Sequence, residues 1–282
     1  MNFVALSLAA SPCPNDTFVF AALANGLLHD APQIEVHLAD IDELNAAAAR
    51  GQYDLVKVSY DAIPYLADRY RILRTGGALG RGCGPLLVAR PDLAPPLFAD
   101  FARKRIAIPG ERTTAFALLQ LALGRRPHTM VMRFDEIVAA VAAGKADGGL
   151  IIHESRFTYR EAGLIAIADL GEWWENLTLL PLPLGAILVR DGLPDDAVRA
   201  AANAIRASLA FARADAAAVM PYVREHSAEM SEEVMRAHID LYVNEFTSDL
   251  GATGIEAAHA FFARAHDAGI LPRAAEPRFA GA

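Results

Sequence analysis

One histidine of this sequence lies where a proton-transfer group would be expected. The apolar run Gly148–Ile152 ends at His153. Such a run predicts a buried strand, and a residue at its carboxyl end emerges at the edge of an open α/β sheet, where ligands bind. Because imidazole exchanges protons near neutral pH, His153 is a candidate general base. A core histidine with a satisfied hydrogen bond would fit the same position.

The loop Ser11–Phe18 could bind an anion or a polar oxygen of a substrate. It contains two prolines and lies between a predicted strand and a predicted helix. Asn15, Asp16 or Thr17 can cap that helix, which would leave other backbone amides at its N-terminus free. A capped turn without a ligand is the alternative.

A second loop, Pro109–Ala115, also joins a predicted strand to a predicted helix. Thr113 and Thr114, together with the amides beside them, could hold a carboxylate at the positive end of that helix. Helix capping alone is the alternative. No Lys-Ser or Lys-Thr pair follows Gly110, which excludes a Walker-type phosphate loop.

A lysine interrupts the apolar strand predicted at Leu55–Ser59. Strand alternation places Lys57 and Ser59 on the same side. Burial of an ammonium group is costly unless a carboxylate or a polar cleft receives it. Lys57 therefore either contacts a substrate or forms an internal salt bridge.

Composition and the remaining motifs exclude several classes of protein. The 282 residues carry 26 Lys and Arg against 34 Asp and Glu, a net charge of −8, so no basic surface for nucleic acid is expected. The histidines and cysteines show no zinc-site spacing, and the glycine run Gly76–Gly84 lacks the dinucleotide fingerprint. No apolar stretch is long enough to span a membrane. We expect a small-molecule carboxylate ligand and no nucleic-acid or membrane partner, while an oligomer is compatible with the composition.

The N-terminal stretch Met1–Ala10 is apolar, but no Lys or Arg precedes it and Pro12 stands directly before Cys13. It therefore does not match a secretory or lipoprotein signal, and we expect a first strand there. This favours a cytoplasmic protein.

Apolar runs of about five residues alternate with longer helical patterns through the first two thirds of the chain, which predicts βα units on a mainly parallel sheet. The expected strands are Asn2–Leu8, Ile34–Leu38, Leu55–Ser59, Leu86–Ala89, Arg105–Pro109, Met130–Phe134, Gly148–His153, Leu164–Ala168 and Leu184–Val189. The expected helices are Thr17–Leu28, Ile41–Arg50, Asp61–Ala67, Thr113–Leu123, Asp135–Ala143 and Arg156–Ala162. From Pro194 onward we expect helices only.

We expect an α/β protein of two lobes with a ligand cleft between them. Residues 1–88 and 187–282 would form lobe I, which includes the C-terminal helices, and residues 89–186 would form an inserted lobe II. The glycine- and proline-rich stretches Gly76–Pro96 and Pro181–Asp191 would carry the two crossings. A single doubly wound domain with a helical extension fits the pattern almost as well.

Four segments together resemble one enzyme family, the 1,4-dihydroxy-6-naphthoate synthases of the futalosine route to menaquinone. They are Ser11–Phe18, Ala78–Gly82, Gly149–Tyr159 and Leu182–Ala186. The most specific is Gly-Leu-Ile-Ile-His-Glu-Ser-Arg-Phe-Thr-Tyr, which contains His153, and the likeness covers nearly the whole chain.

The resemblance implies a fold similar to type II periplasmic binding proteins and a lyase activity without metal or organic cofactor. It implies that cyclic dehypoxanthinyl futalosine is split into 1,4-dihydroxy-6-naphthoate and dihydroxyacetone, with His153 as the proton acceptor. The substrate contacts that it implies are Lys57, Val58, Ser59, Thr114 and Ala115, to which we add Asn15 and Thr17.

Two other functions remain alternatives. One is a chorismate dehydratase of the same pathway, which has a similar fold and is expected to lack the motif around His153. The other is a non-catalytic solute-binding protein, against which the lack of a recognisable signal peptide counts.

Overall fold

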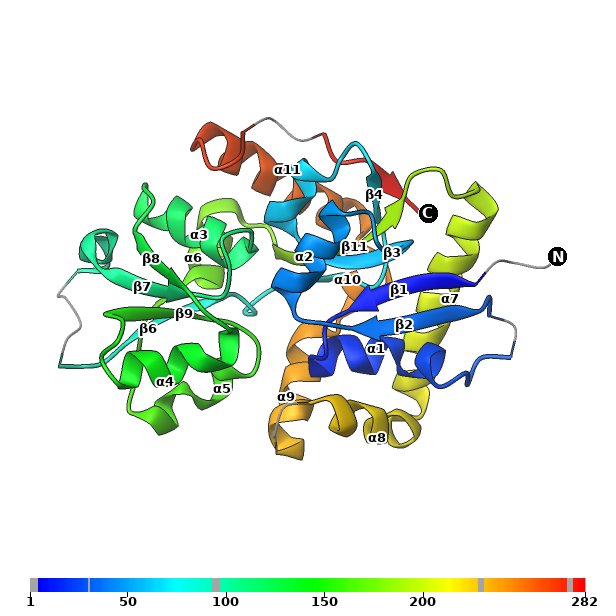
Figure 1. Ribbon diagram of the computed structural model, residues 1–282, viewed down its shortest axis with the longest axis horizontal. Coiled ribbons are helices and arrows are strands. Elements are labelled where there is room, and N and C mark those ends of the chain that lie inside the picture. The colour runs from blue at the N-terminus through cyan, green and yellow to red at the C-terminus, as the bar shows by residue number, and fades with distance from the viewer. Residues whose placement is uncertain (1–4, 30, 93–96, 228–230, 273–275, 282) are drawn as a thin grey trace.

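Short apolar runs form a first sheet at one end of the molecule (Figure 1). The computed structural model describes residues 5–29, 31–92, 97–227, 231–272 and 276–281. β1 (Leu6–Ala10) pairs in parallel with β2 (Ile34–Leu38) and β3 (Leu55–Ser59), and β11 (Leu182–Arg190) pairs antiparallel with β3. The strand order is β12-β4-β11-β3-β1-β2, and β5 pairs with β11. The remaining strands are β4 (Tyr70–Leu73), β5 (Ala78–Gly80) and β12 (Phe279–Ala280).

A second sheet has the order β10-β6-β9-β7-β8. β9 (Gly148–Ile151) lies at its centre, parallel to β7 (Arg105–Ile108) and antiparallel to β6 (Leu86–Ala89). β8 (His128–Val131) and β10 (Ile165–Asp169) form the edges. All four residues of β9 are buried, as expected of a strand covered on both faces.

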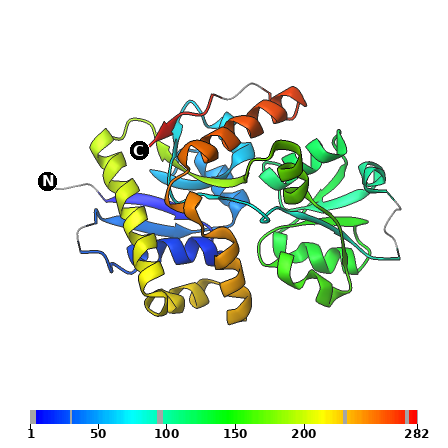
Figure 2. The same cartoon turned by 180° about the vertical axis from the view of Figure 1, so that it is seen from behind.

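The C-terminal part of the chain covers the first sheet with helices (Figure 2). The longest, α7 (Asp195–Ala214), buries one face that includes Val198, Ile205 and Leu209 and packs against α1 (Pro14–Ala24). This is the face that its three-and-four apolar spacing predicts. The other helices are α2 (Ile41–Ala49), α3 (Thr114–Leu123), α4 (Ile137–Ala142), α5 (Ser155–Thr158), α6 (Leu170–Thr178), α8 (Ala216–His226), α9 (Glu232–Tyr242), α10 (Glu245–Ser248) and α11 (Gly251–Asp267). Short 3₁₀ helices occupy Tyr60–Tyr65, Phe98–Arg103, Phe134–Glu136 and Tyr159–Ala162.

One apolar cluster extends through both sheets. It joins β3 and α11 on the first sheet to α3, α6 and strands of the second, with Tyr60, Phe116, Trp174 and Phe261 among its fully buried members. The opposite face of the first sheet packs separately, against α1 and α7–α9. The two lobes therefore share a core on one side.

The chain passes from the first sheet to the second between β5 and β6, and returns between α6 and β11. These connections are residues 81–85 and 179–181. The boundaries predicted at residues 88 and 187 fall inside β6 and β11, because strand-like runs alone do not show which sheet a strand joins. The strands form two separate sheets, so the alternative of a single doubly wound domain is wrong.

Several elements differ from the sequence prediction. The strands β4, β5 and β12 were not predicted: β5 and β12 have only three and two residues, and Arg71 interrupts the apolar run of β4. The helix α6 was not predicted either. Residues 60–65 form a 3₁₀ helix that contains Pro64, which cannot donate a helical hydrogen bond. Residues 2–4 of the first predicted strand lie outside the described residues. No helix in the described part of the chain combines the length and apolar character needed to cross a membrane.

Candidate active site

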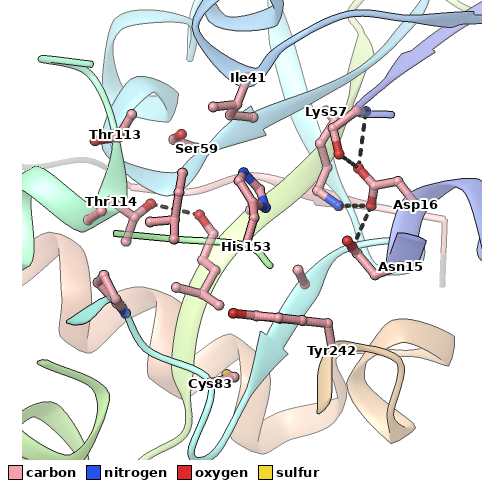
Figure 3. Close-up of a pocket in the computed structure, with 17 residues that line it drawn as sticks. Asn15, Asp16, Ile41, Lys57, Ser59, Cys83, Thr113, Thr114, His153 and Tyr242 are labelled. Carbon is pink, nitrogen blue, oxygen red and sulfur yellow. Dashed lines mark hydrogen bonds and ion pairs between the residues drawn. The ribbon is translucent and has the colours of Figure 1, made fainter. Parts of the chain in front are cut away.

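A pocket lies between the two sheets and is lined from both (Figure 3). The loop after β1, the start of α1 and the strand β3 line it from the first lobe, and the N-terminus of α3 and the residues after β9 line it from the second. Its lining comprises Ser11, Asn15, Asp16, Ile41, Lys57, Ser59, Ala78, Cys83, Pro85, Thr113, Thr114, Ala115, Ile152, His153, Leu184, Gly185 and Tyr242. The cleft expected between the lobes is therefore present.

His153 is half-buried in this pocket, two residues after the end of β9. Its backbone is left-handed, with φ of 55°, an unusual conformation for a residue with a side chain and one that clusters at functional sites. The ring of Phe134 packs edge-on against it at 5.1 Å. Burial lowers the pKa of His153 to about 4, with opposing contributions from Asp16, which raises it, and Lys57, which lowers it. The imidazole is thus neutral at physiological pH.

The Sγ atom of Cys13 lies 3.3 Å from Nδ1 of His153. Burial raises the pKa of the Cys13 thiol well above its ordinary value, so the sulfur keeps its proton. The contact fits either an S–H donated to Nδ1 or an Nδ1–H donated to sulfur. In the second arrangement, the basic lone pair is on Nε2.

Lys57 and Asp16 form a buried ion pair, with Nζ 2.5 Å from Oδ1. The Asp16 carboxylate also accepts hydrogen bonds from the Asn15 amide at 2.8 Å and from the Ser11 hydroxyl and backbone amide at 2.7 and 3.1 Å. Four donors satisfy this carboxylate, whereas the ammonium group makes a single hydrogen bond within the described residues. Lys57 is therefore both salt-bridged and part of the pocket lining.

The helix α1 starts earlier than predicted. Cys13 is its N-cap, without a side-chain cap, and Pro14 occupies the first turn, where its fixed φ is favourable. The capping role predicted for Asn15, Asp16 or Thr17 is therefore wrong. Thr17 is fully buried, outside the pocket, and its hydroxyl donates to the carbonyls of Cys13 and Pro14 at 3.0 and 3.3 Å.

At the start of α3, the threonine hydroxyls are already engaged. Thr113 is the N-cap and accepts from the Phe116 amide, and its hydroxyl donates to the Gly110 carbonyl at 2.9 Å. The Thr114 hydroxyl donates to the Leu184 carbonyl at 2.7 Å and accepts from the Tyr60 amide at 2.9 Å. What remains for a ligand are the backbone N–H groups of Thr114 and Ala115, which have no acceptor among the described residues and lie at the positive end of the helix.

The end of β3 supplies one further polar group. Ser59 lines the pocket, its amide donates to Oδ1 of Asn45 at 3.0 Å, and its hydroxyl accepts from the Asn45 amide at 3.4 Å. The side chain of Val58 belongs to the apolar core and does not line the pocket. The pocket thus brings together Lys57, Ser59, Thr114, Ala115, Asn15 and His153 from the predicted set, but not the side chains of Val58 and Thr17.

Sequence reasoning missed two residues of α9. Tyr242 lines the pocket, and His238, one turn before it, lies between Tyr242 and His153. The imidazole of His238 is 4.5 Å from the phenol ring and stacks on His153 at 6.3 Å and 21°. Burial lowers the pKa of His238 well below its usual value. The spacing of four residues shows that His238 and Tyr242 share a helix face, but nothing local links that face to a cleft formed by distant strands.

Arg156, in α5 of the second lobe, binds the first connection between the lobes, residues 81–85. Its guanidinium donates to the carbonyls of Gly84 and Gly82 at 2.5 and 3.0 Å and pairs with Asp169 at 2.6 Å. Within the described residues, no group of three or more His, Cys, Asp and Glu side chains is arranged to hold a metal ion.

Comparison with known proteins places these features in context. A family model described as menaquinone biosynthesis matches residues 6–267. The 1,4-dihydroxy-6-naphthoate synthase of Streptomyces coelicolor is 47% identical over 277 residues, 96% of either chain. The enzyme of the same name from Thermus thermophilus is 47% identical over 276 residues, 98% of this chain and 99% of its own.

Solved structures support the fold. A protein from Archaeoglobus fulgidus has a TM-score of 0.88 and 32% identity, with 95% of this chain and 98% of its own covered. The alkanesulfonate-binding protein of Xanthomonas axonopodis, solved with MOPS bound, has a TM-score of 0.73 and 17% identity over 97% of this chain and 96% of its own. This second likeness concerns the fold alone, and it agrees with the two-lobed, periplasmic-binding-protein-like architecture.

Proposed function

The chain belongs to the menaquinone biosynthesis family, and from this we infer that it is a 1,4-dihydroxy-6-naphthoate synthase, a carbon–carbon lyase. The match over nearly the whole length of two enzymes of that name supports this activity. The observation that supports the mechanism is a neutral, half-buried His153 in a pocket between the lobes that also contains groups suited to an anion.

The proposed substrate is cyclic dehypoxanthinyl futalosine, an intermediate of the futalosine route, and the proposed products are 1,4-dihydroxy-6-naphthoate and dihydroxyacetone. Two sets of donors in the pocket suit a carboxylate. One is the pair of free N–H groups at the start of α3, and the other is the ammonium of Lys57, which keeps N–H groups beyond its bond to Asp16. Ser59 and Asn15 line the same space.

The proposed chemistry begins with proton abstraction. His153 takes a proton from a carbon next to a carbonyl group, and the electrons of the C–H bond become those of an enolate. Collapse of this anion breaks a carbon–carbon bond, and formation of the aromatic ring favours the product. Because burial holds the imidazole neutral, the base is in its active form at neutral pH without a neighbouring carboxylate to assist it.

The test is turnover by the purified protein. We expect the naphthoate product, detected by chromatography and mass spectrometry, and a loss in kcat of about 100-fold or more for His153→Ala, the usual contribution of a general base. His128→Ala is a suitable control because His128 lies at the start of an edge strand of the same lobe, outside the pocket lining. A His153→Ala variant that folds and retains full turnover would remove this residue from the mechanism.

The same assay separates the alternatives. Conversion of chorismate instead of the cyclic substrate would indicate the dehydratase, and binding without conversion would indicate a solute-binding protein. We also propose a cytoplasmic location, as suits a biosynthetic enzyme, and cell fractionation with an antibody would test it.

A further inference from the structure

Tyr242 lines the pocket, and its hydroxyl has no hydrogen-bond partner among the residues that the structure describes. Five hydroxyl-bearing side chains line the pocket, and four of them, Ser11, Ser59, Thr113 and Thr114, make hydrogen bonds within the protein. The Tyr242 hydroxyl makes none with any described residue, although its side chain is only 8% exposed. In Figure 3 its oxygen is directed toward the middle of the pocket, away from α9.

The ring of Tyr242 is buried, but its hydroxyl opens into the pocket and is not one of the enclosed polar atoms left without a partner. A phenol with a buried ring normally finds a partner for its polar end. The ring of Tyr242 packs on the imidazole of His238, with 4.5 Å between the ring centroids, and this contact holds the side chain in its position. The missing partner is therefore expected to be supplied by whatever occupies the pocket.

The phenol is suited to donate rather than to accept a proton. Burial raises the pKa of Tyr242 far above the physiological range, and nearby Cys83 raises it further. The group therefore keeps its proton throughout the reaction and offers it to an acceptor oxygen. Such a fixed donor in a partly closed pocket stabilises a developing oxyanion more than it stabilises a neutral carbonyl.

The geometry also links this donor to the base. The rings of Tyr242 and His153 both contact the imidazole of His238, from the first and the second lobe respectively. A substrate in this one pocket could thus meet both His153 and the Tyr242 hydroxyl, while the N–H groups at the start of α3 remain for its carboxylate.

We propose that Tyr242 is a further catalytic residue, whose hydroxyl donates a hydrogen bond to the substrate carbonyl oxygen that becomes negatively charged when His153 removes the neighbouring proton. The proton goes to His153, the C–H electron pair forms the enolate double bond, and the carbonyl π electrons move to oxygen. Tyr242 forms no covalent bond and loses no proton. This assignment rests on the proposed function.

The decisive variant is Tyr242→Phe, which removes the hydroxyl and keeps the ring that packs on His238. We expect kcat to fall by about a hundredfold to a thousandfold, the range found for loss of one oxyanion donor, while KM changes less than about threefold. Calorimetry should give the inactive His153→Ala variant and the double variant His153→Ala/Tyr242→Phe substrate affinities within about threefold of each other. If the hydroxyl had only a structural role, its loss would not lower kcat selectively while leaving KM and substrate affinity nearly unchanged.

Tyr222→Phe is the matched control. Tyr222 is a half-buried tyrosine of α8, packed on His226 at 4.4 Å, and its hydroxyl also makes no hydrogen bond with the described residues, but it does not line the pocket. Its kcat should equal that of the wild type.

Two results would overturn the assignment of Tyr242: a kcat for Tyr242→Phe within twofold of the wild type, or a raised KM with kcat unchanged. Failure of the proposed function looks different, because the wild-type protein itself would then not convert the substrate.

Discussion

At the scale of residues, the site depends on an imidazole kept neutral by its surroundings. His153 has a sulfur rather than a carboxylate beside Nδ1, and the two charges that act on its pKa, Asp16 and Lys57, are paired with one another. Desolvation therefore dominates, and the pKa falls to about 4. A carboxylate beside the ring would instead favour imidazolium, the form that cannot accept a proton.

We predict that His153 does not titrate near its ordinary pKa of about 6.5. In an NMR titration of labelled histidine, its ring signals should remain those of neutral imidazole from about pH 8 to about pH 5, and the acid limb of kcat/KM attributable to His153 should lie near pH 4. Since the unfolded chain binds this proton first, His153 also lowers the free energy of unfolding as pH falls from about 6.5 to about 4, and has no effect above. A ring that titrates close to pH 6.5 would contradict this.

The position of His153 was predictable from sequence because a rule of α/β sheets connects the end of an apolar strand to the ligand site. The position of Tyr242 in the pocket was not predictable, because it depends on how the C-terminal helices pack on the first sheet. For Lys57, the sequence left a substrate contact and an internal salt bridge as alternatives and named no partner; the structure shows an ion pair with Asp16 at the wall of the pocket.

At the scale of elements, three strands have the bounds that the sequence predicts: β2, β3 and β6. The central strand β9 ends at Ile151 rather than at the predicted His153, whose left-handed backbone cannot continue a strand. The short strand β5, which precedes the first connection between the lobes, was not predicted. It is defined by its pairing with β11 and not by a local sequence pattern. The close approach of the first crossing to α6 is likewise tertiary: a Cβ at Gly84 would lie 2.2 Å from the backbone nitrogen of Gly171.

Gly84→Ala should therefore disturb the crossing. A methyl group there collides with backbone that cannot move like a flexible side chain, and we expect a loss of about 2–4 kcal/mol in the free energy of unfolding, in the upper range for single substitutions. Urea denaturation measures it. Gly82→Ala is the comparison: nothing lies within 4 Å of its added Cβ, and only its φ of +65° opposes a side chain. Its cost should be about 1–2 kcal/mol. Equal losses would show that the contact with Gly171 is not limiting.

At the scale of the whole molecule, the two lobes were predicted from the change in pattern along the chain, but the core that joins them was not. Apolar periodicity shows which face of an element is buried, and it does not show against which neighbour. The cluster that contains Phe116 and Trp174 of the second lobe and Tyr60 and Phe261 of the first makes them one packed unit on that side.

This shared core predicts that the lobes unfold together. Both tryptophans of the chain, Trp173 and Trp174, lie in α6 of the second lobe, so their fluorescence reports on that lobe. Far-UV circular dichroism is dominated by the long helices α7 and α11 of the first. In urea the two signals should change with the same midpoint, as in a two-state transition. An earlier midpoint for fluorescence would mean that the second lobe unfolds independently.

During synthesis, β3 leaves the ribosome long before β11, the strand that lies between it and β4 in the finished sheet. The strands of the second lobe all fall between Leu86 and Asp169, so that lobe has its full set before β11 is made. Until then one edge of β3 is unpaired, and such edges invite association with other chains. The second lobe can thus complete its sheet while the first sheet still lacks β11. We expect chaperones that bind nascent chains to act on the first ninety or so residues.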